Sequence, residues 1–577
     1  MDYKGQNDHQ RDWDRKAMGH FEMSIVKDME EQTHQRHDTP STFQETYLDE
    51  KASIVSMRQE EEVEDFTVVY PSTPRLIALC CGLAMIVFTV ALDNTIIATA
   101  IPKITTTFNA VDDVGWYGAS YLVTTTALQP TFGKVFQYFD VKWVYVSALV
   151  IFELGSVICA VASTSMILIV GRAVAGIGAA AIFSGSMTIL GYSVPLEKRA
   201  IYLGIMSSMF GLASVVGPIM GGALTDNLSW RWCFWINLPF GTVSFVAICV
   251  FFKNPRLKNA CKPLKQKIKE MDLVGSALFI GAIVCLLLAL QWGGITYPWS
   301  EPKVMGCLIA FAIMFVLFLG IQYKLGDAAV MPPRVLVGNR TVATSAIFTM
   351  LFAMAMYTHI FYLPFYFQAV KGVSAEQSGI NVIPFLIALT IAGICVGAFI
   401  TLVGYYCPPL YVGSAIFCVG SGLLYTLTPE STSAQWIGYQ IVAGFGVGMV
   451  VQVPFIAMQA TLKEDDMPIG NAVAAFFNTF GGAIGLAIDQ NIFATTLKQA
   501  VVDYLYDVNP FLLLKAGTTE IYEYIPAEQI PKVLFAYNYT ITTVFIMPIA
   551  VTLAAFFVGF CMKWKSVKGQ NLLAAVG

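Results

Sequence analysis

The chain of 577 residues contains about fourteen segments that are each roughly 20 residues long and mostly apolar. An α-helix needs about 20 such residues to cross the hydrocarbon core of a bilayer. Hydrophobic types make up 56% of the chain and charged types 13%, whereas soluble domains are about 25% charged. This composition excludes a soluble globular protein and a disordered chain, and it predicts an all-α polytopic membrane protein. The segments lie at about 76–100, 115–135, 143–163, 167–190, 201–223, 232–252, 272–292, 304–323, 342–366, 379–401, 409–427, 435–460, 470–492 and 541–562.

The distribution of basic residues indicates the orientation of these spans. An even number of spans places both ends of the chain on one side, and cytoplasmic loops are enriched in Lys and Arg. The loop at 253–271, after the sixth span, carries seven of them, and Lys563 and Lys565 follow the last span. We therefore predict that both termini are cytoplasmic and that the one long outer loop is 493–540.

The basic loop also divides the spans into six, two and six. Two six-helix bundles around a site at the membrane midplane are typical of transporters. Ahead of the first span, acidic residues outnumber basic ones about two to one, and no apolar run marks a signal peptide. The predicted regions are an acidic, disordered cytoplasmic tail at 1–74, a bundle at 75–252, the basic loop with two inserted helices at 253–340, a bundle at 341–562 and a cytoplasmic tail at 563–577.

Ionisable side chains are rare inside the spans, where each costs on the order of 2.5–3.5 kcal/mol on insertion scales. Asp93 lies in the first span and Arg172 in the fourth. A carboxyl in a partly wet cavity can exchange protons, and a fixed cation changes its proton affinity, so this pair is the candidate for proton coupling. The alternatives are a packing role for Asp93 and snorkelling of Arg172 to the outer interface. Glu153 stays open between coupling and buried hydrogen bonding, and a wet outer mouth is the favoured explanation for Asp489.

Polar residues spaced by four follow one face of the second span, and other polar and aromatic residues lie in spans 9, 12 and 13. Such a stripe is expected to face a cavity or another helix rather than lipid. Rings and amides without dense charge suit organic molecules of middle size, although tyrosines at span ends also serve as interface anchors. The predicted lining consists of Tyr117, Tyr121, Thr125, Gln129, His359, Tyr362, Gln452 and Asn478.

The fifth span is dense in glycine and contains a proline. Proline bends a helix, and glycines let a second helix approach closely. The density favours a role in gating, with ordinary helix packing as the alternative. The residues concerned are Gly211, Gly217, Pro218, Gly221 and Gly222.

Four motifs together resemble the 14-span drug:proton antiporter branch of the major facilitator superfamily, and fungal toxin and multidrug exporters within it. They are Leu92-Asp93-Asn94-Thr95-Ile96-Ile97, the segment 171–178, the glycine–proline stretch of the fifth span, and the Trp-rich turn at 230–241. The resemblance implies a major facilitator fold, a coupling role for Arg172 and an antiporter motif in the fifth span.

The loop between spans 2 and 3 matches that family less well. It contains Gly133, Lys134 and Asp140. The superfamily usually has an acid where Gln137 stands, and that acid helps to latch the closed state. Either Asp140 or a different polar contact is therefore expected to replace it.

These features favour a proton-driven exporter of hydrophobic small molecules that works by alternating access in a fungal plasma membrane, with a vacuolar or vesicle membrane as the alternative. The expected partners of this monomer are its substrate, protons and the lipid bilayer. We expect no cofactor, no metal, no enzymatic activity and no nucleic acid, because P-loop, HExxH and GxSxG motifs are missing and the pI is about 5.8. A siderophore transporter of a related 14-span branch and a non-transporting membrane sensor stay as alternatives, and the fifth-span motif favours export.

Overall fold

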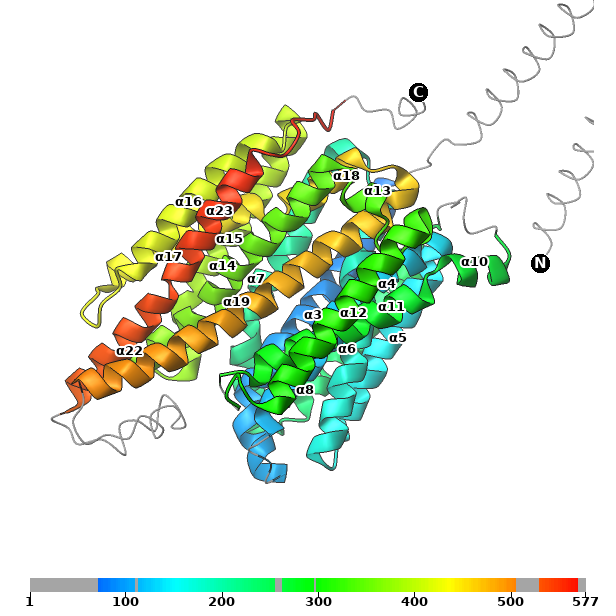
Figure 1. Cartoon of the computed structure of the whole chain (residues 1–577). Coiled ribbons are helices and arrows are strands. Elements are labelled where there is room, and N and C mark those ends of the chain that lie inside the picture. Colours follow the sequence, from blue (N-terminus) through cyan, green and yellow to red (C-terminus); the bar gives the residue numbers. More distant parts are fainter. Residues whose placement is uncertain are drawn as a thin grey trace, which may run out of the picture. The chain divides into compact units, whose positions relative to one another are not determined.

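The computed structural model describes residues 71–108, 110, 113–254, 262–294, 297–504 and 529–568 (Figure 1). The described residues form helices and no β-strand, so the all-α prediction is confirmed. The helices of the first half are α3 (Thr73–Phe108), α4 (Val114–Tyr138), α5 (Val141–Ala160), α6 (Ser165–Ser193), α7 (Leu196–Asn227), α8 (Trp232–Trp235) and α9 (Asn237–Phe251). Those that follow are α10 (Leu264–Glu270), α11 (Leu273–Trp292), α12 (Pro302–Leu325), α13 (Pro333–Leu336), α14 (Arg340–Ala369), α15 (Ala375–Val403), α16 (Cys407–Tyr425), α17 (Ser433–Val450), α18 (Val453–Thr461), α19 (Met467–Tyr504), α22 (Ile530–Val544) and α23 (Ile546–Gly559).

Thirteen helices of the described chain are long and apolar enough to cross a membrane. They match thirteen of the predicted segments. The remaining one is α4, which has 25 residues but is not among those thirteen. The polar stripe along α4 explains its lower hydropathy. The chain is thus a multi-pass membrane protein, and the count of fourteen spans stays a prediction.

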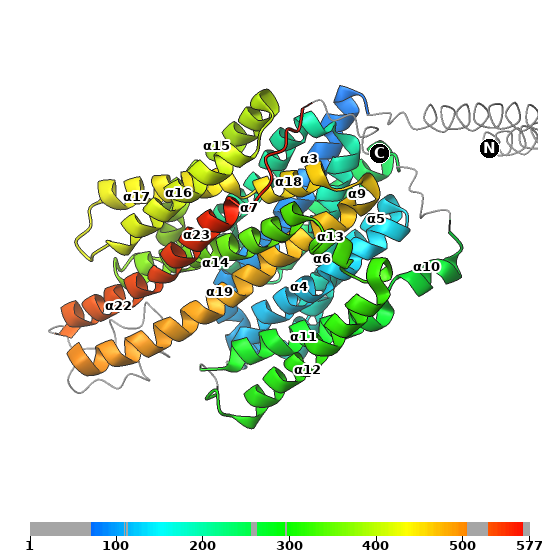
Figure 2. The same ribbon diagram turned by 45° about the horizontal axis from the view of Figure 1, so that its top comes forward.

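Two groups of helices each pack among themselves. In the first half α3 packs on α7 and α9, and α6 packs on α4 and α5; in the second half α15 and α16 pack on α17, and α14 packs on α19 and α23 (Figures 1 and 2). The inserted helix α11 packs on α12 and α4. Contacts between the two groups run through α7 with α15 and through α4 and α6 with α19. The domain boundaries given above stay a prediction.

Close helix approach depends on glycine at several of these contacts. A Cβ at Gly178 of α6 would lie 2.5 Å from the backbone nitrogen of Phe152 in α5. In the second half, a Cβ at Gly448 of α17 would lie 2.1 Å from the carbonyl oxygen of Leu389 in α15. Both contacts bring backbones together in the way that small residues permit between membrane helices.

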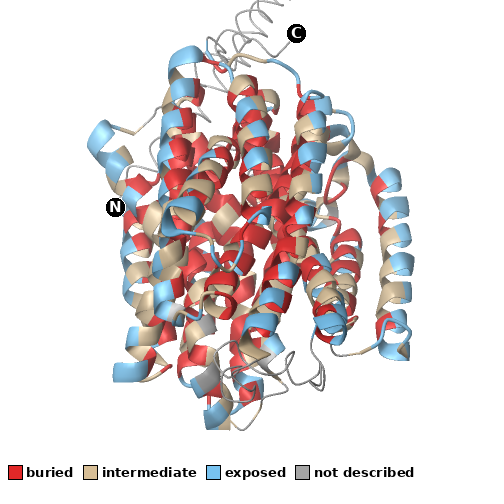
Figure 3. Ribbon diagram, turned by 90° about the vertical axis from the view of Figure 1, so that its left-hand side faces the viewer, coloured by how far each residue is buried: buried red, intermediate tan, exposed pale blue. Residues whose placement is uncertain are grey.

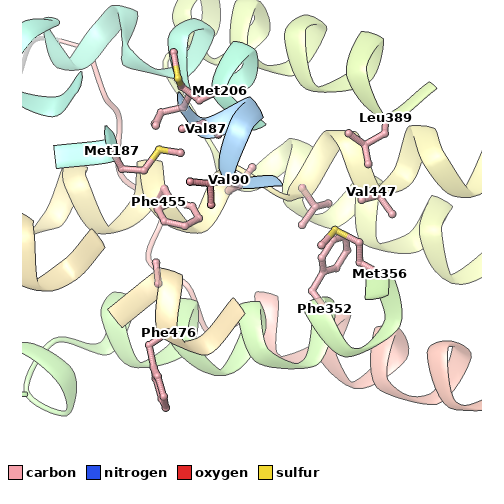
Figure 4. Packing of buried hydrophobic residues seen from close by; sticks show 14 of the residues in the cluster. Val87, Val90, Met187, Met206, Phe352, Met356, Leu389, Val447, Phe455 and Phe476 are labelled. Carbon is pink, nitrogen blue, oxygen red and sulfur yellow. The ribbon is translucent and has the colours of Figure 1, made fainter. Parts of the chain in front are cut away.

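Buried residues gather on the faces that helices turn toward one another, and exposed residues lie on the outer faces (Figure 3). The core continues across the two groups, since Phe455 of α18 lies beside Val90 and Met187 (Figure 4). By contrast, α12 leaves Ile309, Ile313 and other apolar side chains more than half exposed, at 54% and 56%. Apolar exposure along a whole helix is what a lipid-facing position requires.

Two spans differ from their expected ends. The loop predicted at 493–540 is shorter, because α19 continues to Tyr504 and α22 already begins at Ile530. Residues 505–528 of that loop lie outside the described residues. The acidic tail at 1–70 does so as well, and its predicted role stays a prediction.

Candidate functional site: a buried ion pair and an inter-bundle latch

Asp93 of α3 and Arg172 of α6 form a salt bridge inside the first helix bundle, between Oδ2 of the acid and Nη1 of the base. Both residues are fully buried. The Nε of Arg172 donates to the carbonyl oxygen of Tyr117 at 2.9 Å, and its guanidinium lies 4.4 Å from the ring centroid of Tyr121. Full burial rules out the alternative that Arg172 snorkels to the outer interface. The pair that the sequence proposed for coupling is therefore in direct contact, while its role in coupling stays a prediction.

Two residues that the sequence analysis did not single out complete this site. Nδ2 of Asn237 donates to Oδ1 of Asp93 and to Oγ of Ser156, at 3.0 Å in each case. Asn237 lies within the Trp-rich turn at 230–241 and is the first residue of α9. That turn is fixed by Arg231, whose Nη2 donates to the carbonyl oxygen of Ala162 at 2.9 Å. The signal available in the sequence was an amide within the Trp-rich motif at 230–241, and the structure shows that this amide is fully buried.

The polar stripe of α4 faces α6 in this conformation. The hydroxyl of Tyr117 bonds to that of Ser165 at 2.9 Å, and Thr125 donates to the carbonyl oxygen of Gly176 at 3.1 Å. A Cβ at Gly176 would lie 2.5 Å from the carbonyl oxygen of Tyr121, so this glycine lets the stripe sit against α6. Of the two expectations for the stripe, a cavity or another helix, the structure shows the helix for these residues.

Gln129, the last member of the stripe, instead reaches the other bundle. Its Oε1 accepts a hydrogen bond from Thr479 of α19 at 2.8 Å. Asn478, the neighbour of Thr479, is partly exposed, whereas Gln452 is buried and donates to the carbonyl oxygen of Gly393 at 2.7 Å. The assignment of these residues to a substrate cavity stays a prediction.

His359 of α14 lies within the second bundle rather than beside the α4 stripe. Its Nε2 bonds to Oγ of Ser421 at 2.9 Å, and the rings of Phe417 and Phe545 lie 5.6 Å and 5.1 Å away between centroids. His359 is fully buried among these aromatic rings, as a histidine that packs in a protein core is. Its predicted place in the lining is not evident in this conformation.

Asp489 and Tyr362 lie close together in the second bundle. Asp489 is fully buried and accepts a hydrogen bond from Thr358 of α14. The wet outer mouth favoured for Asp489 is therefore wrong, because its side chain is buried against α14, and α19 continues for fifteen more residues to Tyr504. Tyr362 is also buried, with its ring 5.9 Å from that of Phe493.

The glycine–proline stretch of α7 packs on the motif of α3. A Cβ at Gly217 would lie 2.1 Å from Oγ1 of Thr95, and one at Gly221 would lie 2.2 Å from Oγ1 of Thr99. Two of the four family-like motifs thus form one helix contact, within a few turns of Asp93. The other members lie differently. Gly211 faces α15, Pro218 approaches Gly379 of α15, and a Cβ at Gly222 would meet nothing within 4 Å.

The C-terminal end of α4 takes part in a polar cluster that joins the two bundles. Nε2 of Gln137 donates to Oδ1 of Asp466 at 3.3 Å, and Arg334 binds the same carboxylate through Nη1 at 2.9 Å and Nη2 at 3.2 Å. Arg334 also reaches Asp327 at 3.1 Å, and Nζ of Lys134 donates to the carbonyl oxygen of Asp327 at 3.0 Å. The hydrogen bond with Asp466 raises the pKa of Arg334 above its usual value. We call these five residues the latch cluster.

Asp140 is not part of the latch cluster. Its carboxylate instead accepts a hydrogen bond from the backbone nitrogen of Trp143 and caps the start of α5. The expectation that Asp140 replaces the missing acid is therefore wrong, and the second alternative, a different polar contact, is the one observed. Gly133 belongs to the same interface, because a Cβ there would lie 2.6 Å from the Cβ of Ala472 in α19.

Further contacts close the same end of the two bundles. Nδ2 of Asn471 donates to Oγ1 of Thr188 at 3.1 Å, and the hydroxyl of Tyr192 donates to the carbonyl oxygen of Glu464 at 3.2 Å. This is the end that the charge bias assigns to the cytoplasm. Within the described residues, no group of three or more His, Cys, Asp or Glu side chains is arranged to hold a metal ion.

Two packed bundles of apolar helices, with a buried ion pair in one and a latch between them, define a multi-pass membrane transporter. The family model for the Major Facilitator Superfamily matches residues 83–486, and the chain belongs to that family. It is 44% identical over 511 residues to the MFS-type efflux pump MFS1 of Arthroderma benhamiae, covering 88% of this chain and 95% of that protein. It is 37% identical over 535 residues to the aspyridones efflux protein of Neocamarosporium betae, covering 92% and 94%.

Solved structures share the fold at low sequence identity. The human organic anion transporter MFSD10 (TETRAN) superimposes with a TM-score of 0.54 at 12% identity, covering 83% of this chain and 100% of that one. A bacterial homologue of the human lysosomal transporter Spinster, in an inward-facing and unoccupied conformation, gives 0.53 at 14% identity and covers 85% and 98%. The predicted major facilitator fold is confirmed, and the chain is a transporter and not an enzyme.

Proposed function

We propose that this transporter exports hydrophobic small molecules, such as toxins or other secondary metabolites, in exchange for protons. The observation that carries the proposal is the fully buried pair of Asp93 and Arg172 on two different helices of one bundle. Relatives that match most of the chain are named as efflux pumps, and one of them is named for the efflux of aspyridones. These names support export of organic compounds as the direction and substrate class.

The ion pair suggests how a proton would act on the bundle. A proton on the Asp93 carboxyl removes the negative charge that Arg172 binds, so the guanidinium is left with the carbonyl oxygen of Tyr117 and the ring of Tyr121. Breaking a buried pair in this way costs several kcal/mol. Protonation therefore weakens the attraction between α3 and α6 by about that amount, so the two helices separate more easily. α3 in turn packs tightly on α7 through Thr95 and Gly217.

The latch cluster supplies the second element of an alternating-access cycle. It holds α4 and α19 together at the predicted cytoplasmic end, and Asp466, Arg334 and Gln137 would separate when that end opens. The cytoplasmic end is either closed or open. Substrate or a proton shifts the balance between these two states only if it binds one of them more tightly than the other. Rigid movement of two bundles about a central site is the usual form of such a cycle.

The proposal places the chain in the plasma membrane, with both termini in the cytoplasm, and treats the monomer as the transporting unit. The bias of basic residues toward 253–271 supports the orientation. Siderophore uptake and a non-transporting sensor are the competing functions. The glycine contact between α3 and α7 and the names of the relatives favour export.

The purified full-length chain in proteoliposomes tests the proposal. With an imposed pH gradient, we expect uphill movement of the hydrophobic fluorophore Hoechst 33342 that collapses when a protonophore is added. In cells, deletion of the gene is expected to shift a metabolite from the medium to the cell interior. Movement of the dye that runs only downhill and ignores the pH gradient would remove proton exchange from the proposal.

A further inference from the structure

A second carboxyl lies close to the ion pair and makes no hydrogen bond. Glu153 is on α5, and both of its carboxyl oxygens are buried without a hydrogen-bond partner among the described residues. The carboxyl sits against the backbone of α9, where a Cβ at Gly241 would lie 1.7 Å from Oε1. A side chain at position 241 would therefore displace the Glu153 carboxyl from its present place. Within the described part of the chain, no ion pair or hydrogen bond holds this carboxyl in one protonation state.

Glu153 is one helical turn from Ser156, and its neighbour Gly241 is one turn from Asn237, the residue that binds Asp93. Ser156 follows it by three positions on α5, and Asn237 precedes Gly241 by four positions on α9. Residues three and four apart share a face of a helix, and three positions correspond to about 4.5 Å of helix rise. Asn237 joins Oδ1 of Asp93 to Oγ of Ser156 by two hydrogen bonds of 3.0 Å. The seam between α5 and α9 therefore carries a row of polar groups from Asp93 to Glu153.

We infer that Glu153 is a second proton-binding group of this transporter, which exchanges its proton with Asp93 along the seam between α5 and α9. This inference rests on the proposed exchange of substrate for protons. In this conformation Asn237 lies between Asp93 and Ser156, and Glu153 makes no hydrogen bond among the described residues, so the transfer requires side-chain rotations. After them the Asp93 acid gives its proton to Ser156, and the Ser156 hydroxyl gives its own hydrogen to the Glu153 carboxylate. One carboxylic acid and one carboxylate are present before and after the step, so no further reactant is needed.

The seam between α5 and α9 leads from Asp93 toward the predicted cytoplasmic end. α5 begins beside Asp140 at the predicted cytoplasmic end, so Glu153 is nearer to that end than Ser156. α9 runs the opposite way, and Gly241 is correspondingly nearer to the same end than Asn237. Because the latch cluster closes the space between the bundles at this end, a route inside the first bundle lets protons leave without opening the substrate path.

Few other ionisable groups face Glu153. Asp93 of α3 is the charged group that acts on it, and Arg172 of α6 is paired with that acid. The helices α9 and α8, which also pack on α5, carry only Cys249 and Cys233 as titratable side chains in their described lengths. The protonation of Glu153 is therefore tied first to that of Asp93.

Infrared difference spectroscopy tests proton binding without any substrate. The purified full-length chain and its Glu153→Gln variant are titrated from mildly acidic to mildly alkaline pH, and the carbonyl-stretch band of protonated carboxyl groups is followed. We expect one pH-dependent band in the wild type that the Glu153→Gln variant lacks and that the matched variant Glu376→Gln, at the start of α15, retains. Identical titrations of wild type and Glu153→Gln overturn the inference.

Transport in proteoliposomes tests the use of that proton. Uphill movement of Hoechst 33342 driven by a pH gradient is expected to be at least about tenfold slower in Glu153→Gln, and Glu153→Asp is expected to restore part of the rate. Exchange of labelled for unlabelled dye, which moves no net proton, is expected to stay at the wild-type rate. An equal loss in both assays makes Glu153 a structural residue and overturns the inference.

The two proposals fail in different ways. If the wild type ignores the pH gradient, proton exchange itself fails, and a relay that serves it fails as well. If the wild type responds to the gradient and Glu153→Gln matches it in rate and pH profile, the proposed exchange stands and only the inference about Glu153 is overturned.

Discussion

Gln137 of α4 donates a hydrogen bond to Asp466, the residue before α19, across the contact between the two bundles. At the position where the family usually has an acid this chain has the amide of Gln137, and the acid of this contact, Asp466, belongs to the second bundle. Arg334, from the segment that follows the two inserted helices, binds the same carboxylate through two nitrogens. The connection after the insert therefore takes part in closing the predicted cytoplasmic end.

Removing the arginine is expected to loosen this end. Arg334→Ala deletes a paired charge whose side chain is half exposed, at 53%, so the cost is about 1 kcal/mol, or about a fivefold change in the ratio of closed to open states. Thiol labelling of a Thr188→Cys variant, read at that residue by mass spectrometry, reports the opening, because Thr188 is buried against Asn471. Arg340→Ala is the control, since Arg340 binds the carbonyl oxygen of Cys561 inside the second bundle. Equal labelling with and without Arg334 would show that the cluster does not hold the closed state.

The sequence predicted the helices well because about 20 apolar residues in a row leave few alternatives in a bilayer. It also found Asp93 and Arg172, since a charge inside an apolar run is conspicuous. It did not find Arg334 with Asp466, because they lie 132 positions apart in polar connections, where a charge is ordinary. Their meeting depends on how the two bundles pack.

The side-chain environment of a polar residue was harder to predict than its position. A stripe of period four shows that one face of α4 is special, but not whether that face meets a cavity or α6. The structure decides this at Gly176, whose missing Cβ admits Tyr121 and Thr124. Asp489 was misplaced because the apolar pattern ends near position 492, whereas the helix continues through more polar residues to Tyr504.

Gly217 and Gly222 offer a matched pair of substitutions in one helix. Gly217→Ala places a Cβ 2.1 Å from Thr95 and is expected to cost about 1–3 kcal/mol through overpacking. Gly222→Ala meets nothing within 4 Å and is expected to be nearly silent. Thermal unfolding in detergent and the dye assay in proteoliposomes measure both effects.

Gly217→Leu and Pro218→Ala are expected to impair exchange or leak protons, and normal coupled efflux in both would reduce this motif to helix packing.

The orientation of the chain is open to direct measurement with inserted tags. We expect a tag at Glu30 or at Gln570 to be labelled only after the cells are permeabilised, and a tag at Lys515 to be labelled in intact cells. All three positions lie outside the described residues, and the expectation rests on the bias of basic residues. Labelling at Gln570 in intact cells contradicts the arrangement with fourteen spans and two cytoplasmic termini.

Removal of residues 1–65 is expected to leave the transport cycle intact. This segment is strongly acidic and contains no membrane span, and such a composition does not build a packed core. Trafficking or turnover is expected to change more than transport, which is why efflux has to be normalised to the amount of protein at the membrane. A truncated chain that reaches the membrane in normal amount and transports nothing would show that the tail is needed for the cycle.

Asp93 and Arg172 are expected to respond differently to substitution. Asp93→Asn keeps the shape and removes the titratable group, so uphill pH-driven efflux is expected to be lost while downhill exchange continues. Arg172→Lys keeps the charge but loses the planar set of donors that reaches both Asp93 and the carbonyl oxygen of Tyr117. Its pH optimum is expected to shift, because the remaining cation sits differently relative to the carboxyl.

Arg172→Ala is expected to cost stability as well as coupling. The guanidinium is fully buried against the Tyr121 ring, and without it the Asp93 carboxylate would keep, among the described residues, only Asn237 as a partner. Removing one member of a buried ion pair, so that the other stays buried without its partner, lowers the free energy of unfolding by about 3–5 kcal/mol. The double variant Asp93→Asn with Arg172→Ala removes both charges and is therefore expected to unfold at a higher temperature than Arg172→Ala alone. If Asp93→Asn instead pumps uphill with the wild-type rate and pH profile, Asp93 does not carry the proton, and Glu153 or Asp489 becomes the residue to substitute next.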